Sequence, residues 1–456
     1  MRCTFLHDVY LAIAIFLALW VLYAPLAELL FHVLHITSIH RGDELKRDVT
    51  LTFDDGPDPE YTPQMLDLLD AHRVRAVFFL IGEKATRYPE LVREILRRGH
   101  LVGSHTAHHR NAWFLTPWQT FREVRMAAAM IERVTHEPVV WFRPPWGRFN
   151  LFLPLALRSS GQTPVLWSIA GRDWLKGLQI SAIAERIAKR FHNGAVILLH
   201  DSGGAPGAPA NTLRALEQIL PVYREMGFQF TADPVLYAMK AKAKRNGSFP
   251  RVSQRLIHPL WRVWEKLFDR LYSVYPMSRM FRLSLVSWRL GPRPEAGLID
   301  GVKVVEIHLQ NLAVQELQRV KPVERMAIRG LREVRDSLHD VALALLYDKR
   351  FQEGQAIFGM TMIHRGMENL GFHVEDIPDT LLNRWIKFLL SLIMSLYHPE
   401  GRKRFTHGLE AMHPRLMWMS REELITRYGP GAAKSLRATQ QAMAEVATSQ
   451  PPDMEP

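Results

Sequence analysis

Short β-rich runs alternate with amphipathic stretches from residue 49 to residue 231, and this order constrains the fold more than any other feature. Strands are expected, in chain order, at 49–53, 76–81, 101–105, 141–145, 164–168, 195–200 and 228–231. Helices are expected between them at 63–72, 89–98, 117–135 and 181–191, and prolines mark three of their first turns. Nearly continuous apolar strands alternating with helices predict an α/β fold with a helix-covered parallel sheet. Seven such units predict a distorted (β/α) barrel, with its chemistry at the carboxyl ends of the strands.

The length of 456 residues is too great for a single core, so a second domain is expected. A basic stretch that contains Gly and Pro, residues 240–250, is typical of a linker. We therefore predict a barrel domain at 49–239, a linker at 240–255, an α+β accessory domain of unassigned role at 256–448, and a disordered tail at 449–456.

Three segments of the accessory domain support specific expectations. Residues 302–309 predict a strand. The apolar helical stripe at 260–271 predicts a helix that packs on its own domain, with docking on a membrane surface as the alternative. Residues 388–397 are strongly apolar but too short to cross a bilayer, which predicts a core helix.

The N-terminal region, residues 1–48, contains a long uncharged run. No charged residue occurs from Leu11 to Ala27, and more apolar residues follow Glu28. This length just suffices to span a bilayer, and the small residues of a cleavage site are missing. We predict an uncleaved single-pass anchor, with a buried helix of the globular domain as the alternative. The flanking charges do not set its orientation.

The net charge of +12 arises mostly after residue 236. A solvated basic surface explains it most simply, and attraction to anionic lipid or an anionic wall polymer is the alternative. Nucleic acid is not an expected partner, because no recognition helix, zinc finger or RNA-binding signature is present. The single cysteine, Cys3, excludes a Cys-rich zinc site, so any metal must be held by His and carboxylates.

Acidic and imidazole side chains follow the first and third predicted strands. Asp54 and Asp55 are adjacent at a strand end, so one can bind a metal while the other handles a proton. His105 and His109 are four residues apart, and on one helical turn they would face the same side and share a metal with Asp55. His108 would point elsewhere. A capping Asp-Gly turn and a surface His cluster are the structural alternatives.

Three further strands end in polar or aromatic residues. Arg143 precedes two prolines, and this stiff extended backbone suits it to hold a carboxylate bidentately. Asp173 and Trp174 follow the fifth strand and offer a carboxylate and an aromatic wall. His200 ends the apolar sixth strand. Each feature alone has a structural explanation, but their recurrence at five strand ends favours one active site.

These residues carry a family resemblance. The segments TFDDGP at 52–57, HTAHH at 105–109, RPPW at 143–146, Asp173-Trp174 and ILLH at 197–200 resemble the five motifs of the polysaccharide deacetylases, which are carbohydrate esterase family 4 or the NodB-homology domain. Order, spacing and strand placement agree. One departure is Ala170, where many members have a second Asp. Because Asp173 is present, activity is expected to survive, with a changed cleft floor.

The resemblance implies a metal site and a general base. Asp55, His105 and His109 would bind one divalent cation, most often zinc. Such a cation polarises the acetamide carbonyl and lowers the pKa of a bound water. Asp54 would take the proton from that water, and Arg143 would hold Asp54 in place and keep it ionised.

The resemblance also implies the remaining roles. The backbone N–H of Trp146 would help to stabilise the oxyanion. His200 would protonate the leaving amine, while Asp173 orients its ring and raises its pKa. Trp174 and Leu199 would form the apolar pocket for the acetyl methyl group.

The expected function is a metal-dependent hydrolase that removes N-acetyl groups from a GlcNAc-type polysaccharide: peptidoglycan, a chitin-like oligomer or a related glycan. One alternative is a deacetylase of the same fold acting on a small or lipid-linked amide. The other is a non-catalytic glycan-binding protein, against which the intact motifs count. The expected location is the cell membrane, with the catalytic domain outside the cytoplasm, because enzymes of this kind mostly act on wall or extracellular polymers.

Overall fold

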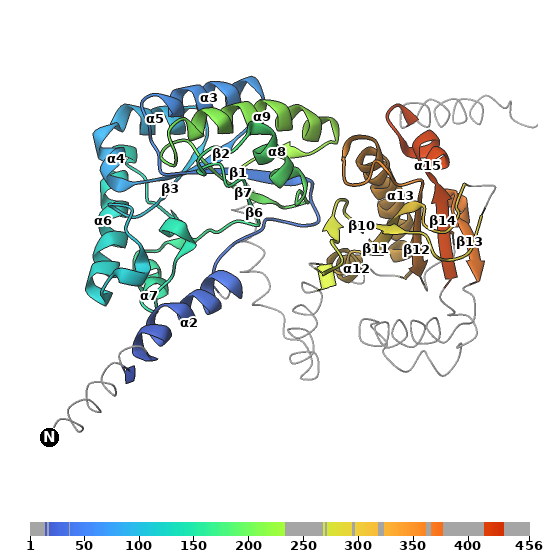
Figure 1. Cartoon of the computed structure of the whole chain (residues 1–456), viewed down its shortest axis with the longest axis horizontal. Coiled ribbons are helices and arrows are strands. Elements are labelled where there is room, and N and C mark those ends of the chain that lie inside the picture. Colours follow the sequence, from blue (N-terminus) through green and yellow to red (C-terminus); the bar gives the residue numbers. More distant parts are fainter. Residues whose placement is uncertain are drawn as a thin grey trace, which may run out of the picture. The chain divides into compact units, whose positions relative to one another are not determined.

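The computed structural model describes residues 14–15, 18–35, 37–232, 268–269, 271–293, 297–317, 323–361, 366–376 and 415–432. The chain divides into two compact units, Met1–Arg251 and Val252–Pro456 (Figure 1). The predicted linker at 240–255, the predicted helix at 388–397 and the predicted tail at 449–456 lie outside the described residues, as does most of the stripe at 260–271.

The first unit contains a parallel sheet. Its strands are β1 (Asp48–Asp54), β2 (Ala76–Leu80), β3 (Leu101–Ser104), β4 (Trp141–Phe142), β5 (Thr163–Pro164), β6 (Ile169–Ala170), β7 (Val196–His200) and β8 (Gln229–Phe230). The strand order is β5-β4-β3-β2-β1-β7-β6, and β8 pairs with β1. Both faces of the central strand β1 are buried, as expected of a parallel sheet covered by helices. The predicted α/β barrel-like fold is confirmed.

The predicted fifth strand, 164–168, is wrong in detail, because two short strands replace it. β5 pairs with β4 and β6 pairs with β7, so they lie at opposite ends of the strand order although only residues 165–168 separate them. This short link requires the sheet to curve round into a half-barrel. Within the link, the carbonyl oxygens of Val165 and Leu166 accept hydrogen bonds from the Arg143 guanidinium rather than from a neighbouring strand.

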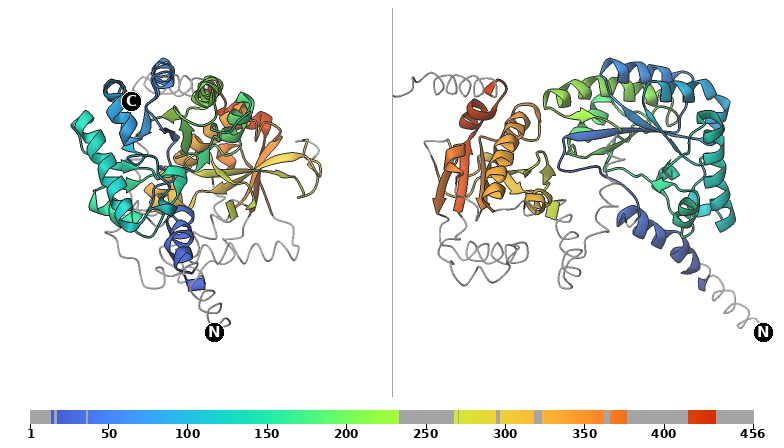
Figure 2. Two further views of the ribbon diagram at one scale, coloured as in Figure 1. Left: turned by 60° about the vertical axis from the view of Figure 1, so that its left-hand side comes forward. Right: turned by 180° about the vertical axis from the view of Figure 1, so that it is seen from behind.

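Helices cover the sheet (Figure 2). They are α3 (Tyr61–Ala71), α4 (Gly82–Arg87), α5 (Pro89–Arg97), α6 (Pro117–Thr135), α7 (Leu153–Ser159), α8 (Ile180–Ala188) and α9 (Ala208–Glu225), with the 3-10 turns η2 (Ala112–Phe114) and η3 (Pro145–Gly147). α5 and α6 begin at the prolines that the sequence marked. Thr116 and Gln119 form a capping box at the start of α6, which satisfies backbone N–H groups of its first turn.

The N-terminal segment packs against the barrel. It includes α2 (Pro25–Glu28) and the π-helical turn η1 (Leu29–Val33). The Tyr23 hydroxyl donates to the Leu115 carbonyl, and Trp113 Nε1 donates to Glu28 Oε2 at 2.7 Å. Where the structure describes the chain, no helix is long and apolar enough to cross a membrane. Residues 1–13, 16 and 17 of the predicted anchor lie outside the described part.

The second unit contains a mixed sheet with the strand order β13-β14-β12-β11-β10-β9. Its strands are β9 (Tyr275–Pro276), β10 (Phe281–Ser287), β11 (Lys303–Leu309), β12 (Ala356–Thr361), β13 (His373–Asp376) and β14 (Arg415–Ser420), and its helices are α12 (Asn311–Leu317), α13 (Val323–Tyr347), the 3-10 turn η5 (Glu368–Leu370) and α15 (Arg421–Tyr428). The parallel strands β11 and β12 are connected through α12 and α13. The predicted α+β class is confirmed, and the strand predicted at 302–309 is β11.

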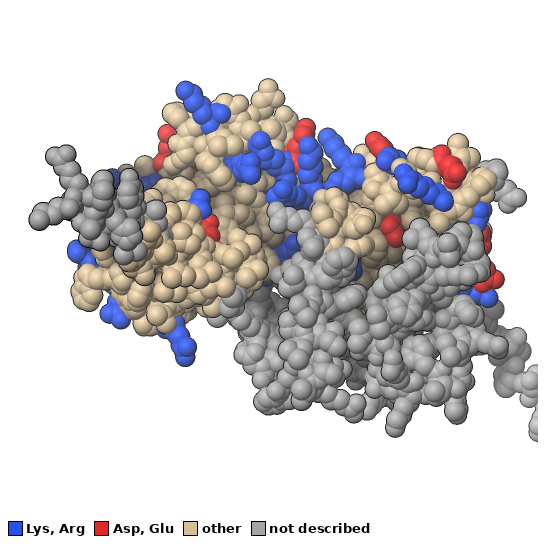
Figure 3. Space-filling model, turned by 60° about the horizontal axis from the view of Figure 1, so that its bottom comes forward, with Lys and Arg blue, Asp and Glu red and all other residues tan. Residues whose placement is uncertain are grey.

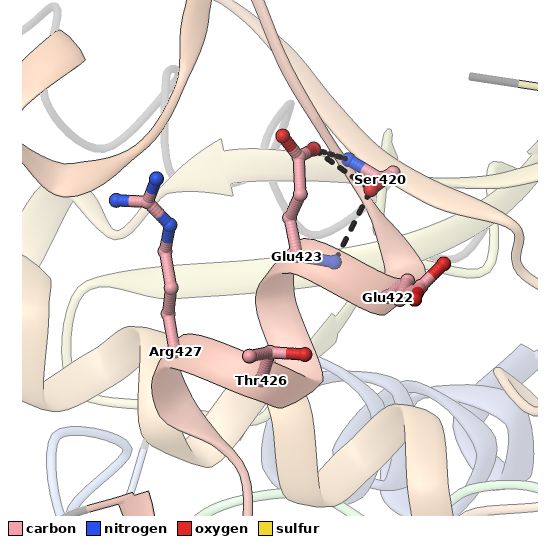
Figure 4. A pocket seen from close by; sticks show the side chains of 5 residues that line it. All are labelled: Ser420, Glu422, Glu423, Thr426 and Arg427. Carbon is pink, nitrogen blue, oxygen red and sulfur yellow. Dashed lines mark hydrogen bonds between the residues drawn. The ribbon is translucent and has the colours of Figure 1, made fainter. Parts of the chain in front are cut away.

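A small pocket at the start of α15 is lined by Ser420, Glu422, Glu423, Thr426 and Arg427 (Figure 4). The Glu423 carboxylate accepts from the backbone N–H and the hydroxyl of Ser420 at 2.9 and 2.7 Å. The Glu423 N–H donates back to the Ser420 hydroxyl at 3.2 Å. These polar groups therefore form a helix capping box, and we assign this pocket no binding role.

Candidate active site

Three predicted metal ligands converge at the carboxyl ends of β1 and β3. Nε2 of His109 lies 3.0 Å and Nε2 of His105 lies 3.4 Å from Asp55 Oδ1. One ligand atom from each residue lies within 4.8 Å of the others. Asp55 has a left-handed backbone, with φ of 70°, which turns the chain just beyond β1.

The two histidines lie on a loop after β3, so their expected placement on one helical turn is wrong. The loop carbonyls of Thr106 and Ala107 accept the first two N–H groups of α4 at 3.0 Å. Thr106 and His109 have left-handed φ of 63° and 54°, which bring both imidazoles to Asp55 without a helix. His108 faces away, as expected, and its Nδ1 pairs with Glu123 Oε1 at 2.9 Å.

The ring orientation of His105 fits a bound cation. His105 Nδ1 lies 2.7 Å from the Arg143 carbonyl oxygen, which can only accept, so Nδ1 carries the hydrogen and Nε2 presents a lone pair to Asp55. Asp55 Oδ1 is buried and makes no hydrogen bond to the described residues. A lone pair facing a buried carboxylate oxygen is repulsive unless a cation lies between them. The three donors therefore match a two-His, one-carboxylate metal site.

The charge of Asp55 suits the same site. Burial alone would raise the pKa of its carboxyl group, but positive charge and hydrogen-bond donation from His105 and His109, when protonated rings take the place of a cation, lower that pKa well below its ordinary value. The Asp55 carboxylate is therefore ionised and can act as a metal ligand.

Asp54 lies beside the metal site and is bound by Arg143. Arg143 is fully buried, and its Nη1 donates to Asp54 Oδ1 and to Thr52 Oγ1, both at 2.7 Å. The expected bidentate grip is wrong, because the rest of the guanidinium donates to backbone carbonyls between β5 and β6. The second carboxylate oxygen of Asp54, Oδ2, lies 3.9 Å from His105 Nε2, on the side of the metal ligands.

His200 and Asp173 form a second polar pair at the end of β7. His200 Nδ1 donates to Asp173 Oδ1 at 2.9 Å, and the His200 backbone N–H donates to Asp173 Oδ2 at 2.7 Å. The hydroxyl of Thr212 also donates to Oδ2, at 2.8 Å. Burial lowers the pKa of His200, but the charge and hydrogen bond of Asp173 outweigh this effect and raise that pKa to about 9. The ring is therefore protonated at neutral pH.

Two aromatic side chains flank these polar groups. The exposed ring of Trp146 lies 4.5 Å from the His109 ring, and Trp174 meets the His200 ring edge-on at 5.1 Å. Trp146 has a left-handed φ of 55° within η3. Leu199 is fully buried, whereas the ring of Trp146 is exposed.

Two residues near the metal ligands were not predicted from the sequence. Lys84 Nζ donates to the backbone carbonyl of Asp55 at 2.8 Å and to Ser202 Oγ at 2.6 Å. Lys84 lies on α4, a helix that the sequence pattern did not indicate. Asp201 is fully buried, accepts a hydrogen bond from Thr62, and has a pKa raised to about 7 by burial. The sequence feature that could have identified Asp201 is its position directly after His200, at the end of an apolar strand.

Gly56 is required by the close approach of Asp201. A Cβ atom on Gly56 would lie 2.6 Å from both carboxylate oxygens of Asp201. Any side chain at residue 56 would therefore displace either Asp201 or the turn that carries Asp55.

Comparisons with known families match both halves of the chain. The family described as "Polysaccharide deacetylase" matches residues 41–165, and the family described as "YkoP domain" matches residues 254–428. The first match contains His105 and His109, and the second covers most of the α+β unit.

Named relatives resemble the first unit. A peptidoglycan-N-acetylglucosamine deacetylase of Bacillus cereus is 36% identical over 184 residues, which cover 40% of this chain and 84% of the relative. A chitooligosaccharide deacetylase of Bradyrhizobium sp. is 33% identical over 201 residues, which cover 42% of this chain and 91% of the relative. A crystal structure of a peptidoglycan N-acetylglucosamine deacetylase matches with a TM-score of 0.42 and 31% identity, covering 45% of this chain and 95% of that one.

A curved parallel sheet with a two-His, one-carboxylate site at its strand ends fits a metal-dependent hydrolase. With this similarity over most of its relatives' length, the chain belongs to the polysaccharide deacetylase family. It is accordingly a deacetylase, a hydrolase that acts on N-acetylated glycans.

Proposed function

We propose that Asp55, His105 and His109 hold one zinc ion and that the chain deacetylates GlcNAc residues of a peptidoglycan-type glycan outside the cytoplasmic membrane. The observation that carries the metal assignment is the buried oxygen of Asp55 facing the lone pair of His105. Two imidazoles and one carboxylate leave positions for water and substrate, as in catalytic zinc sites.

The roles of the polar residues follow from which atoms are already engaged. A divalent cation at this site supplies Lewis acidity, which polarises the acetamide carbonyl and acidifies the attacking water. Asp54 Oδ1 accepts from Arg143, so Oδ2 is the atom that takes the proton from that water. His200 Nδ1 is engaged by Asp173, so Nε2 delivers a proton to the leaving amine.

The proposed roles of the substrate-pocket residues follow from how far each side chain is exposed. Trp146 and Trp174 present aromatic surfaces on either side of the polar groups and suit the apolar face of a sugar ring and the acetyl methyl group. The backbone N–H of Trp146 donates to the developing oxyanion in this proposal. Leu199, fully buried, supports the pocket from behind.

The substrate assignment rests on the relatives. The Bacillus cereus relative is named for peptidoglycan GlcNAc, and the Bradyrhizobium relative for chitooligosaccharides, which makes a chitin-like oligomer the second candidate. A lipid-linked GlcNAc amide is the remaining candidate. The uncharged N-terminal run supports a membrane location, and a wall glycan as substrate supports an outward-facing catalytic unit.

Metal reconstitution and a substrate panel test this proposal. The metal-stripped full chain is supplied with zinc, cobalt, manganese or magnesium, and acetate release is measured from peptidoglycan, chitotetraose and a lipid-linked GlcNAc. We expect one zinc per chain, lost in Asp55→Ala, and the fastest release from peptidoglycan. Release from the lipid-linked amide alone would overturn the substrate assignment, and full activity without any divalent metal would overturn the metal assignment.

A reporter fused after Pro234 that is active only outside the cytoplasm tests the location. We expect activity from this reporter and silence from a cytoplasmic reporter at the same position. The reverse pattern would contradict a wall polymer as the substrate.

A further inference from the structure

The N-terminal segment has one face packed against the barrel and one face exposed to solvent. Ala24 and Ala27 are fully buried, and Ala27 belongs to the same core cluster as Phe142 and Phe149. Arg148 donates to Glu28 at 2.6 Å, which fixes the segment on its barrel side. This face of the segment is therefore packed into the catalytic unit.

The opposite face is an exposed apolar stripe. Its members recur at alternating spacings of four and three residues, as on one side of a helix: Ile15, Leu19, Leu22, Leu26, Leu29 and Val33. A side chain of this type exposed singly needs no explanation, but a continuous stripe indicates an interaction surface.

The turns of the barrel that contact the segment carry further exposed apolar residues. Phe114 and Trp118 are 74% and 78% exposed, and Leu151 and Leu155 are also exposed. The Leu151 N–H donates to the Tyr23 carbonyl at 2.8 Å, which places this turn directly beside the stripe. We call the stripe together with these four residues the apolar surface.

The charged side chains around the apolar surface are mostly basic. Residues 18–35, 110–125 and 144–160 contain five arginines, Arg110, Arg122, Arg125, Arg148 and Arg158, and two acids, Glu28 and Glu123. Glu123 is buried and pairs with His108. Glu28 is paired with Arg148, and its side chain is only 15% exposed. Figure 3 shows the first unit with a broad uncharged area, which carries Lys or Arg side chains and a few Asp or Glu side chains.

We propose that the apolar surface docks the catalytic unit onto an anionic lipid bilayer. Exposed tryptophan, phenylalanine and leucine with an arginine rim is the composition of an interfacial membrane-binding surface. Like charge argues against a second copy of this chain as the occupant, because pairing two such surfaces would bring their arginines together. The choice of a lipid bilayer as the partner rests on the membrane location proposed above, and the existence of the apolar surface does not.

Docking on lipid would hold the active site at the membrane surface. His32, on the same segment, lies with its Nδ1 2.7 Å from the Gly147 carbonyl oxygen, and its ring packs edge-on against Trp167. Gly147 follows Trp146, whose ring lies beside the metal ligand His109. The segment therefore contacts the residue next to Trp146 at the candidate active site, and the favoured substrates are glycans close to the membrane.

Single-cysteine labelling of the full chain tests the proposal. Cys3 is the only cysteine, so a Cys3→Ser background allows one environment-sensitive fluorophore to be placed by Phe114→Cys or Leu155→Cys. Val222→Cys is the matched control, an exposed apolar residue on α9, which Figures 1 and 2 place on the far side of the unit from α2. Vesicles of phosphatidylcholine with or without phosphatidylglycerol are added, some carrying lipid-attached nitroxide quenchers.

With phosphatidylglycerol vesicles we expect a blue shift and nitroxide quenching at positions 114 and 155 but not at 222, and a weaker effect without the anionic lipid. Bound vesicles with all three probes still in water would show that only the N-terminal run reaches the lipid, and would overturn the proposal. A blue shift at 114 and 155 without lipid, together with a dimeric mass, would overturn it in favour of a second copy. Acetate release from soluble chitotetraose, measured on the same samples, reports separately on the proposed function.

Discussion

Replacing Asp173 with asparagine should shift the pH dependence of deacetylation. Asp173 accepts three hydrogen bonds, two from His200 and one from Thr212, and its charge keeps the His200 ring protonated. Asp173→Asn removes the largest effect that offsets burial, while the charges of Asp54 and Asp55 still raise the pKa of His200. That pKa, about 9 in the wild type, should fall to about the ordinary value of 6.5.

The direction and the size of this shift in the pH profile follow from the proposed role of His200 as the acid. The group must be protonated to work, so activity falls as pH rises through its pKa, and a lower pKa moves this fall to lower pH. At about pH 7.5 the protonated fraction would drop from nearly complete to about one tenth. We therefore expect at least a roughly tenfold lower kcat/KM at that pH, with the alkaline limb displaced by about two pH units or more.

The assay is kcat/KM against pH for zinc-loaded protein, with amine formation on chitotetraose as the readout. Thr212→Val is the control, because it removes one hydrogen bond to Asp173 and keeps the charge. Equal zinc content and equal melting temperature would exclude loss of metal or fold. An alkaline limb in the same place in Asp173→Asn and wild type would refute the assignment of His200 as the acid.

Three further changes test the surroundings of the metal. His105→Ala should lower zinc affinity sharply in metal titrations while His108→Ala, paired with Glu123 instead, should not; equal losses would show that the ligand set is wrong. Gly56→Ala should cost about 1–3 kcal/mol of unfolding free energy in urea, because the new Cβ meets Asp201, and Asp201→Ala in the same chain should recover part of it. Lys84→Met should weaken zinc binding, since its Nζ holds the Asp55 carbonyl, and unchanged affinity would exclude a positioning role.

The sequence predicted the catalytic unit well because its signals are local. Buried strands read as apolar runs, and helix starts were marked by Pro89 and Pro117. Polar residues directly after such runs meet at one edge of a parallel sheet, so Asp55 and His105 could be placed together without coordinates.

Other features depend on tertiary contacts and were not predictable. The spacing of His105 and His109 fits a helical turn, but the loop carbonyls between them bind α4 and hold the chain in another shape. The split of the fifth strand reflects Arg143, which uses carbonyls that would otherwise pair within the sheet. The apolar run that ends at His200 indicates that Leu199 is buried, but it does not indicate whether this side chain contacts a bound acetyl group.

The sequence of the N-terminal run does not distinguish between two kinds of helix. Its uncharged composition from Leu11 to Ala27 fits a spanning helix and an amphipathic surface helix alike. The contacts of Tyr23 and Glu28 with the barrel and the burial of Ala24 and Ala27 distinguish the buried face from the exposed face.

The most direct test of the mechanism compares Asp54→Asn and His200→Ala with wild type at equal zinc content. Acetate release from chitotetraose is measured in single-turnover and steady-state experiments, with zinc per chain determined on the same samples. Each variant should retain one zinc and lose about 10²–10⁴-fold in turnover, because each lacks one proton carrier while Asp55, His105 and His109 remain. Wild-type turnover in either variant would contradict the proposed division of labour between Asp54 and His200.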